Sequence, residues 1–502
     1  MKRNPPGGGD QSRTPYFQAL LDYVDSGVLP FHTPGHIQGI GMDLAFREFI
    51  GDNVCAIDLT PMPGIDDLLQ PTESIKEAQA LAAQAWGADN SFFLINGSTS
   101  GNQCMMMTAV NPGDEIAVPR NSHKSMLGGL VMSGARPIYM QPEVDEDLHM
   151  DHCVTPETVS RTLESHPNLA AIYVVSPTYY GVAADLAAIE RIAHDAGKLL
   201  LVDEAWGPHF HFHPDLPLSA TSAGADLCIN STHKMLSAMS QCAMLHQKGT
   251  RVRLDRLKSV LKMFLSTSPN LPLVASLDVA RKQMATEGTK LLARTIELAN
   301  ETRQRINRVE GLYCLGDDAI GRPGVFDLDP TKIAVTVKGL GYTGYEASEI
   351  LRHRYNIQVE LADLFNVVAL FTIGTTREAA DRLAAAFEEL ARDDRPVDLY
   401  APSGILERRL GRGSYRLPKI PPMRMLPREA FLADTEFVKF KDSKGRICAE
   451  TISPYPPGIP VIAPGEEITS DLIDYLRLEM KAGVRIQGTY DDRLKTIRVV
   501  VE

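Results

Sequence analysis

Apolar and polar positions alternate along the middle of the chain in a pattern that predicts strands separated by helices. Five short apolar runs have the length of buried strands, at residues 91–95, 115–118, 170–175, 199–202 and 226–230. Between them, residues 74–86 and 189–196 carry apolar side chains at helical spacing. This alternation is typical of an α/β fold, in which helices cover both faces of a mostly parallel central sheet. Such sheets bind ligands beyond the carboxyl ends of their strands.

The patterns at the two ends of the chain predict further domains. Residues 1–14 are rich in Pro and Gly, and we expect them to be disordered. The last hundred residues predict strands at 436–440, 447–452 and 497–501 with a helix at 470–482, which together make a small α+β domain. A shift toward Pro, Arg and Gly between residues 392 and 424 marks the boundary before it. The expected division is a disordered tail (1–14), an N-terminal arm (15–73), a large domain (74–315), a small domain (316–395) and a C-terminal domain (396–502).

Charge and composition narrow the class of protein. The net charge of −12, without a basic stripe, argues against a nucleic-acid partner. No window is apolar for long enough to span a membrane, and the segment MKRNPPGGGDQS lacks the apolar core of a signal peptide. The seven cysteines form no CxxC pair and are typical of reduced thiols. We therefore expect a cytoplasmic protein.

The most informative stretch follows the strand at 226–230. Ser231, Thr232, His233 and Lys234 separate this strand from an uncharged run rich in Ala, Met and Ser. Burying an ammonium group is costly, and one chemistry that uses a desolvated lysine is Schiff-base formation with a carbonyl. The alternative is a lysine whose stem is buried while its amine reaches solvent.

Together with Asp203-Glu204-Ala205-Trp206, the Ser-Thr-His-Lys sequence resembles the ornithine/lysine/arginine decarboxylase family, and the resemblance extends from about residue 31 to about residue 467. It implies the aspartate-aminotransferase-like fold of pyridoxal-phosphate (PLP) enzymes. It also implies that Lys234 forms the Schiff base with PLP and that Asp203 faces the pyridine nitrogen. One departure from the family's pattern is Ile37, where a lysine is usual after Thr-Pro-Gly-His.

Residues 96–102, Asn-Gly-Ser-Thr-Ser-Gly-Asn, follow the first strand and precede an apolar helix. Such a turn offers backbone N–H groups and hydroxyls to an anion, although Ser and Thr also serve as ordinary helix caps. The resemblance implies that Thr99 and Ser100 bind the PLP phosphate and that His123 stacks on the pyridine ring. Its further cofactor contacts are Gly97, Ala205, Ser231 and His233.

The resemblance further implies a basic amino-acid substrate, with arginine to agmatine favoured and lysine or ornithine next. Lys234 and His233 are both candidates to return the proton after carbon dioxide leaves, and His123 belongs to the same catalytic set. The candidates for substrate contacts are Trp206, Glu466, Asp66 and Asp67, or an acid from a neighbouring subunit. The chain resembles the short decarboxylases of polyamine biosynthesis, which lack an N-terminal wing domain. We expect a homodimer with shared active sites, or a dimer of dimers.

Two motifs suggest other cofactors. Gly339-Leu-Gly-Tyr-Thr-Gly344 follows an expected strand at 333–337 and precedes an expected helix at 345–354, as in dinucleotide-binding proteins. It lies in the small domain of the family, without a second nucleotide-binding half, so NAD is not expected. His209, His211 and His213 alternate and would share one side of an extended segment. No Cys or carboxylate completes a metal site at usual spacing, so we expect one or more of these histidines to line the cofactor pocket and do not expect a metal.

Two other functions stay open. An aminotransferase would hold the substrate carboxylate with an arginine, and Arg377 is the candidate for that role. A catalytically idle regulatory protein on the same fold is the other alternative, but it would not need the intact set of Lys234, Asp203, His123, Thr99 and Ser100.

Overall fold

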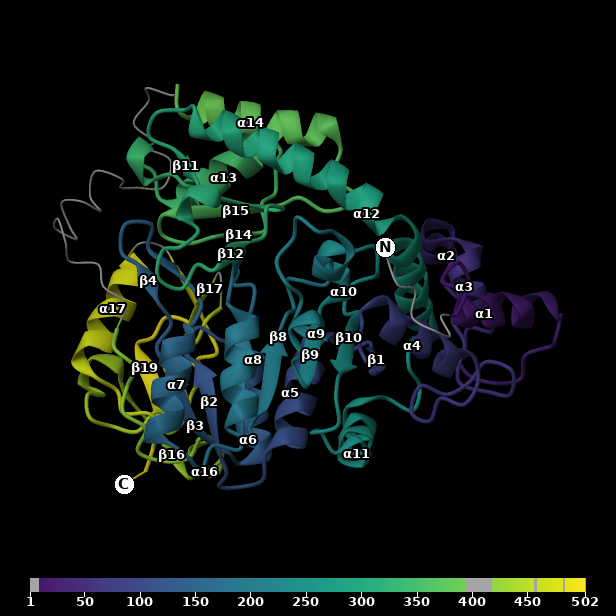
Figure 1. The fold of residues 1–502 in the computed structure, drawn as a ribbon, viewed down its shortest axis with the longest axis horizontal. Coiled ribbons are helices and arrows are strands. Elements are labelled where there is room, and N and C mark those ends of the chain that lie inside the picture. The colour runs from purple at the N-terminus through teal and green to yellow at the C-terminus, as the bar shows by residue number, and fades with distance from the viewer. Residues whose placement is uncertain (1–8, 393–417, 456–457, 482–483, 502) are drawn as a thin grey trace. The chain divides into compact units, whose positions relative to one another are not determined.

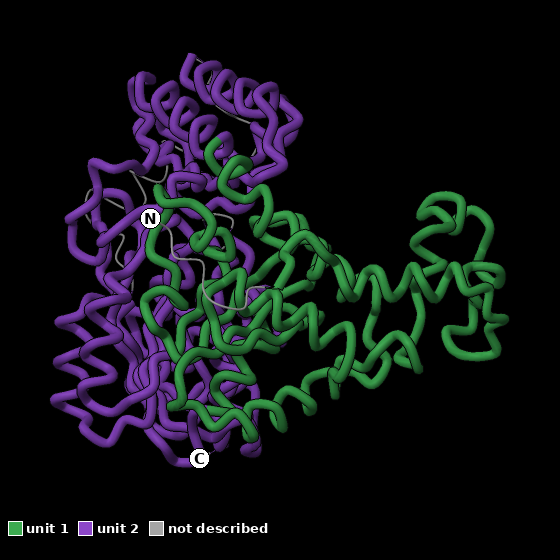
Figure 2. Tube along the Cα trace, turned by 45° about the vertical axis from the view of Figure 1, so that its right-hand side comes forward, with its two compact units in different colours: residues 1–108, 201–293 green, residues 109–200, 294–502 purple. Residues whose placement is uncertain are grey.

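The computed structural model describes residues 9–392, 418–455, 458–481 and 484–501 (Figure 1). It has two compact units, shown in different colours in Figure 2. Unit 1 comprises Met1–Thr108 and Leu201–Ala293, and unit 2 comprises Ala109–Leu200 and Arg294–Glu502. The expected α/β class with a mostly parallel central sheet is confirmed, since β8–β9, β2–β6 and β2–β3 pair in parallel.

Unit 1 contains one part of the central sheet, in the order β1-β10-β9-β8. Its strands are β1 (Asn90–Leu94), β8 (Leu199–Asp203), β9 (Leu227–Asn230) and β10 (Ala243–Gln247). Every residue of β9 and β10 is buried, which explains their continuous apolar sequences. The helices are α1 (Pro15–Asp25), α2 (Leu44–Ile50), α3 (Asp52–Ile57), α4 (Ser74–Ala85), α5 (Gly97–Ala109), η1 (Phe210–Phe212), α9 (Ala220–Ala223), α10 (Thr232–Met235), α11 (Leu254–Phe264) and α12 (Leu271–Asn307), whose end lies in unit 2.

The beginning of the chain differs from the expectation of a disordered tail. Gly9 donates a backbone hydrogen bond to Gln84 of α4, at 3.0 Å. The buried guanidinium of Arg281 donates to the carbonyls of Gln11 and Arg13 and pairs with Asp278 at 2.7 Å. Residues 9–14 are thus fixed by hydrogen bonds to α4 and α12, and residues 1–8 lie outside the described part.

Unit 2 contains the other part of the central sheet, in the order β6-β2-β3, together with a four-stranded antiparallel sheet in the order β11-β13-β15-β14. Figure 1 shows α13 and α14 beside this smaller sheet. The strands are β2 (Glu115–Pro119), β3 (Arg136–Met140), β4 (Val144–Asp145), β5 (Met150–Asp151), β6 (Ala171–Val175), β7 (Val182–Ala183), β11 (Tyr313–Cys314), β12 (Asp327–Leu328), β13 (Lys332–Thr336), β14 (Leu361–Ala362) and β15 (Asn366–Leu370). The helices are α6 (Lys124–Ser133), α7 (Pro156–Ser165), α8 (Leu186–Asp195), η2 (Asp317–Ala319), η3 (Lys338–Leu340), α13 (Gly344–Arg354) and α14 (Arg377–Leu390).

The C-terminal part of unit 2 has its own apolar core around α17. Its elements are α16 (Pro427–Leu432), β16 (Thr435–Lys439), η4 (Phe440–Asp442), β17 (Ser453–Tyr455), α17 (Ser470–Lys481), β18 (Arg485–Gln487) and β19 (Thr496–Val500). The strand expected at 447–452 is wrong, because Ile447, Cys448 and Ile452 each form only a single bridge to a different partner strand or loop. The boundary expected at 395/396 lies outside the described residues. Across the described residues, none of the helices combines the length and hydropathy that crossing a membrane requires.

Candidate active site

Strand β8 ends in a buried carboxylate that two donors hold in place. Asp203 is 4% exposed, and its Oδ2 accepts a hydrogen bond of 2.8 Å from the side-chain amide of Asn102. Its Oδ1 accepts from the backbone N–H of Ala205, at 3.1 Å. Asn102 is itself 1% exposed and lies on α5, whereas Asp203 lies at the end of a strand. The sequence analysis missed Asn102 as a functional residue.

Helix α5 begins within the segment expected to be a phosphate-binding turn. Gly97, with a φ of 70°, donates its N–H to the carbonyl of Gln241, and the first turn has no acidic residue. Thr99 is exposed there, and the Ser98 and Ser231 hydroxyls lie 2.7 Å apart. The start of a helix presents N–H groups that have no partner within the helix, which suits a phosphate.

Gly101 explains how α5 comes so close to the sheet. A Cβ atom at this position would lie 2.3 Å from Cδ1 and 2.6 Å from Cγ1 of Ile229 in β9. Only glycine permits this close packing, and the contact brings the first turn of α5 next to the end of β9, where Ser231 begins the lysine segment.

Lys234 lies on the short helix α10, directly after β9. Its Nζ is 3.7 Å from the centroid of the Trp206 ring, which is 6% exposed. The preceding residue, His233, has its Nδ1 2.8 Å from the carbonyl oxygen of Cys242. A carbonyl oxygen only accepts hydrogen bonds, so Nδ1 carries the proton, and in the neutral ring Nε2 is the nitrogen that can accept one.

These groups of unit 1 match the functional groups of PLP. The Lys234 amine suits its aldehyde, the fixed Asp203 carboxylate suits its pyridine nitrogen, and the hydroxyl-rich start of α5 suits its phosphate. All three come from carboxyl ends of strands or from the helix that follows a strand. The chain can therefore hold PLP with its own residues.

His123 belongs to unit 2, where it caps the N-terminus of α6. Its Nδ1 accepts the backbone N–H of Ser125 at 3.2 Å and lies 2.8 Å from that residue's hydroxyl. In the neutral ring the proton is therefore on Nε2. Stacking of His123 on the cofactor remains a prediction.

Two of the acids named as candidates for the substrate's distal cation already have full sets of partners. Glu466 is 0% exposed and binds Arg120 through both carboxylate oxygens, at 2.7 and 3.0 Å. Asp66 accepts backbone N–H bonds of 2.9 Å from Thr72 and Ile75 near the start of α4. Burial opposes ionisation of Asp66, but the backbone N–H bonds outweigh it and lower its pKa. These contacts argue for structural roles, while Asp67 is half-buried and remains a candidate.

The glycine motif in the small domain serves packing. A Cβ on Gly339 would lie 2.4 Å from the carbonyl oxygen of Gly311, and one on Gly344 would lie 2.3 Å from that of Asn366. Thr343 and Glu346 form a capping box at the start of α13, so a carboxylate already occupies this helix N-terminus. A negative charge at that point disfavours a nucleotide phosphate.

The three alternating histidines are not in an extended segment, so that expectation is wrong. Phe210–Phe212 forms the 3-10 helix η1, which turns the side chains in different directions. His209 is buried, and His211 lies 3.1 Å from the Ser222 hydroxyl through Nδ1. Among the described residues, no group of three or more His, Cys, Asp or Glu side chains is placed to hold a metal ion.

Comparisons with known proteins identify the family of this chain. The family model for the Orn/Lys/Arg decarboxylase major domain matches residues 14–379, and that for the C-terminal domain matches residues 413–492. The arginine decarboxylase of Bacillus subtilis is 44% identical over 98% of this chain and 99% of its own length. The lysine decarboxylase LdcA of Pseudomonas aeruginosa is 30% identical over 92% of this chain and 75% of its own length. The crystal structure of the Francisella novicida lysine decarboxylase LdcF superposes with a TM-score of 0.83 and 25% identity, over 97% of this chain and 81% of that one. The chain belongs to the Orn/Lys/Arg decarboxylase family, whose cofactor is pyridoxal phosphate.

Proposed function

We propose that the protein decarboxylates arginine to agmatine and carbon dioxide, with lysine or ornithine as the next candidates. The observation that carries the proposal is the set formed by Lys234, Asp203 and the start of α5 within unit 1. The choice of arginine is supported by four relatives named arginine decarboxylase, which are 44–45% identical to this chain, against 30% or less for those named lysine decarboxylase.

Each residue of the set has a defined task. Lys234 would supply the amine that binds the cofactor, and Asp203 would keep the ring nitrogen protonated. Thr99 and Ser100 would hold the phosphate, with Ser100 using its backbone N–H, because its buried hydroxyl donates to the carbonyl of Gly97. PLP supplies an electron sink for the electrons left when the bond from Cα to the carboxylate breaks. His233 through Nε2, or Lys234 through Nζ, then returns a proton to Cα of the substrate.

The contacts of Arg377 disfavour the aminotransferase alternative, in which this residue would bind the substrate carboxylate. Arg377 begins α14, has a side chain that is 53% exposed, and forms an ion pair with Glu301. An arginine engaged in this way at an exposed position is poorly suited to hold a substrate carboxylate. The idle regulatory protein is disfavoured because the catalytic set is complete.

A homodimer is proposed from the apolar surface of the N-terminal arm. Four large side chains between residues 28 and 50 are three-quarters or more exposed: Leu29, Phe31, Ile40 and Phe49. Monomeric proteins rarely expose so many neighbouring apolar side chains, and a second copy of the chain would cover them. Light scattering should give the mass of a dimer or a dimer of dimers, and Phe31→Glu combined with Phe49→Glu should shift it toward the monomer. We also propose that the enzyme is cytoplasmic and that agmatine enters polyamine biosynthesis.

Carbon dioxide and product analysis with arginine, lysine and ornithine tests the reaction. We expect gas and agmatine from arginine, and neither from Lys234→Ala. Formation of a keto acid without gas would replace the proposal with an aminotransferase, and inactivity of the PLP-loaded protein on all three amino acids would favour the idle alternative.

A further inference from the structure

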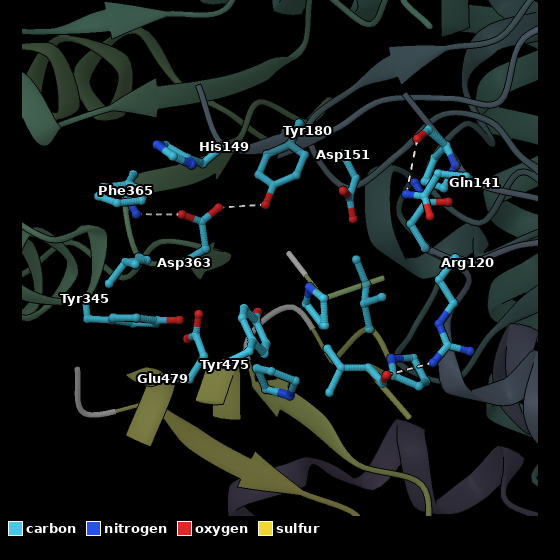
Figure 3. Close-up of a pocket in the computed structure, with 18 residues that line it drawn as sticks. Arg120, Gln141, His149, Asp151, Tyr180, Tyr345, Asp363, Phe365, Tyr475 and Glu479 are labelled. Carbon is cyan, nitrogen blue, oxygen red and sulfur yellow. Dashed lines mark hydrogen bonds between the residues drawn. The ribbon is translucent and has the colours of Figure 1, made fainter. Parts of the chain in front are cut away.

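Unit 2 contains a cavity of about 120 Å³ that is rich in acidic and aromatic side chains (Figure 3). Asp151 reaches it from β5, Asp363 from the turn after β14, and Glu479 from α17. Figure 3 shows the Asp151 carboxylate pointing into the cavity, with Asp363 and Glu479 on the opposite side. This volume is well above what one water molecule needs.

The acids differ in how they are satisfied by the chain. Asp363 accepts hydrogen bonds from the Tyr180 hydroxyl at 2.6 Å and from the N–H groups of Phe365 and Asn366 at 2.8 Å. The Asp151 side chain, in contrast, accepts no hydrogen bond from any residue that the structure describes. Asp151 is partly exposed, so its carboxylate has hydrogen-bonding capacity that a donor of a bound ligand could take.

Among the residues that the structure describes, the cationic side chains beside this lining have other partners. Arg120 lies at the edge of the cavity but is paired with Glu466 through both carboxylate oxygens. Burial and the nearby Lys338 lower the pKa of His149, so this ring is neutral at pH 7. The Lys338 ammonium donates to the carbonyl of Asp147.

Burial opposes the ionisation of two of these acids, Asp151 and Asp363. Burial, with the charge of Asp363 in second place, raises the pKa of Asp151 to about 7. Burial also raises the pKa of Asp363. For Tyr345, burial followed by the charges of Glu479 and Asp363 raises the pKa of the phenol.

We propose that this cavity binds an aliphatic organic cation, with its ammonium or guanidinium group on Asp151 and its methylene chain against the rings of Tyr345 and Tyr475. Aromatic faces favour such cations, and a charge-assisted hydrogen bond would satisfy the open carboxylate. A metal ion is the poorer fit, because no three ligating side chains converge among the described residues. The cation has two possible sources: the distal end of the basic substrate, which rests on the proposed function, or a separate amine effector.

Calorimetry of the PLP-loaded enzyme with n-butylguanidinium tests the binding. This probe has a guanidinium group and an apolar chain but no primary amine, so it does not react with the cofactor. Because the cation needs ionised Asp151, binding should release up to one proton and tighten as the pH rises from 6 to 8. Titration in two buffers of different ionisation enthalpy measures that proton.

Two variants, each of which removes one negative charge from the β4–β5 hairpin, distinguish a direct contact with Asp151 from general electrostatic attraction of the cation. Asp151→Asn should weaken binding about tenfold or more and abolish the proton release, since a hydrogen bond to a charged group is lost. Glu146→Gln, at an exposed position, should change neither. Absence of binding to the wild type, binding without proton release, or equal weakening by both variants would overturn the proposal.

Kinetics with arginine distinguishes the two sources. If the site holds the substrate's distal end, Asp151→Asn should raise KM for arginine with little change in kcat, and the probe should compete with arginine. If the site is separate, KM should stay unchanged and inhibition by the probe should be noncompetitive. Probe binding in an enzyme that decarboxylates none of the three amino acids would refute the proposed function and leave the cation site standing.

Discussion

The hydrogen bond from Asn102 fixes the carboxylate of Asp203, which we propose faces the cofactor ring, so Asn102→Ala should weaken PLP binding. The bond is 2.8 Å long, and its partners are 1% and 4% exposed. A buried hydrogen bond to a charged group contributes about 1.5–3 kcal/mol. If this energy is expressed fully in cofactor binding, the Kd for PLP rises about tenfold to a hundredfold. With one donor lost and the Ala205 N–H still in place, the carboxylate is less firmly oriented, and the protonation of the ring nitrogen becomes less complete.

Dialysis of the purified variant against a series of PLP concentrations measures this Kd, and a pH titration of the visible absorbance band measures the change in ring electrostatics. Gln103→Ala is the matched control, since Gln103 lies on the same helix, is half-buried and makes no side-chain hydrogen bond to a described site residue. Equal PLP affinity and equal band titration in Asn102→Ala and the control would refute a positioning role for Asn102.

Three further tests use urea unfolding to measure how a close contact, a buried histidine and a buried ion pair contribute to stability. Gly101→Ala forces a Cβ to 2.3 Å from Ile229 Cδ1 and should lower the free energy of unfolding by about 1–3 kcal/mol. Adding Ile229→Val should recover part of that loss. If the effects of the two substitutions simply add, the close-contact explanation is contradicted. Burial lowers the pKa of His246 from 6.5 to about 3, so below pH 6.5 only the unfolded chain gains this proton. The wild type should therefore lose about 2 kcal/mol between pH 6.5 and 5, and an equally steep loss in His246→Gln would contradict this assignment. Glu466→Gln leaves the largely buried Arg120 without its ionic partner and should lower the free energy of unfolding by about 3–5 kcal/mol. The double variant Arg120→Met with Glu466→Leu should restore much of that stability. A single variant as stable as the wild type would refute the importance of the pair.

The residues that local sequence could identify are those at strand ends. Asp203 and Lys234 follow short apolar runs, and the structure has β8 and β9 at those positions. Their position predicts a ligand site because parallel strands gather their carboxyl ends at one edge. The segment 96–102 was expected to be a turn, although it is mostly the first turns of α5. The small polar residues of this segment suit either a turn or the start of a helix. The packing of Gly101 against β9, which the sequence does not reveal, accompanies the helix.

Contacts between distant residues could not be predicted from one sequence. Asn102 and Asp203 are 101 positions apart, and Arg120 and Glu466 are 346 apart. Neither pair has a local periodicity that marks it. Glu466 was therefore a candidate to bind the cationic end of the substrate, whereas in the structure it forms an ion pair with the largely buried Arg120.

Long-range packing also explains the incorrect strand at residues 447–452. Cys448, Ala449 and Ile452 are buried and Ile447 is half-buried, but Ile447, Cys448 and Ile452 each pair singly with a separate segment. Burial periodicity reports which side chains face a core, and it does not report whether the neighbouring backbone continues a ladder. The acidic cavity of unit 2 arises in the same way, from three segments that are far apart in the sequence.

The most direct test of the central claim is the location of the cofactor on the chain. The purified protein, loaded with PLP, is reduced with borohydride and digested, and mass spectrometry identifies the labelled peptide. The account predicts one labelled residue, Lys234, with no label in Lys234→Ala. Label on another lysine, or a wild type that takes up no PLP, would contradict it.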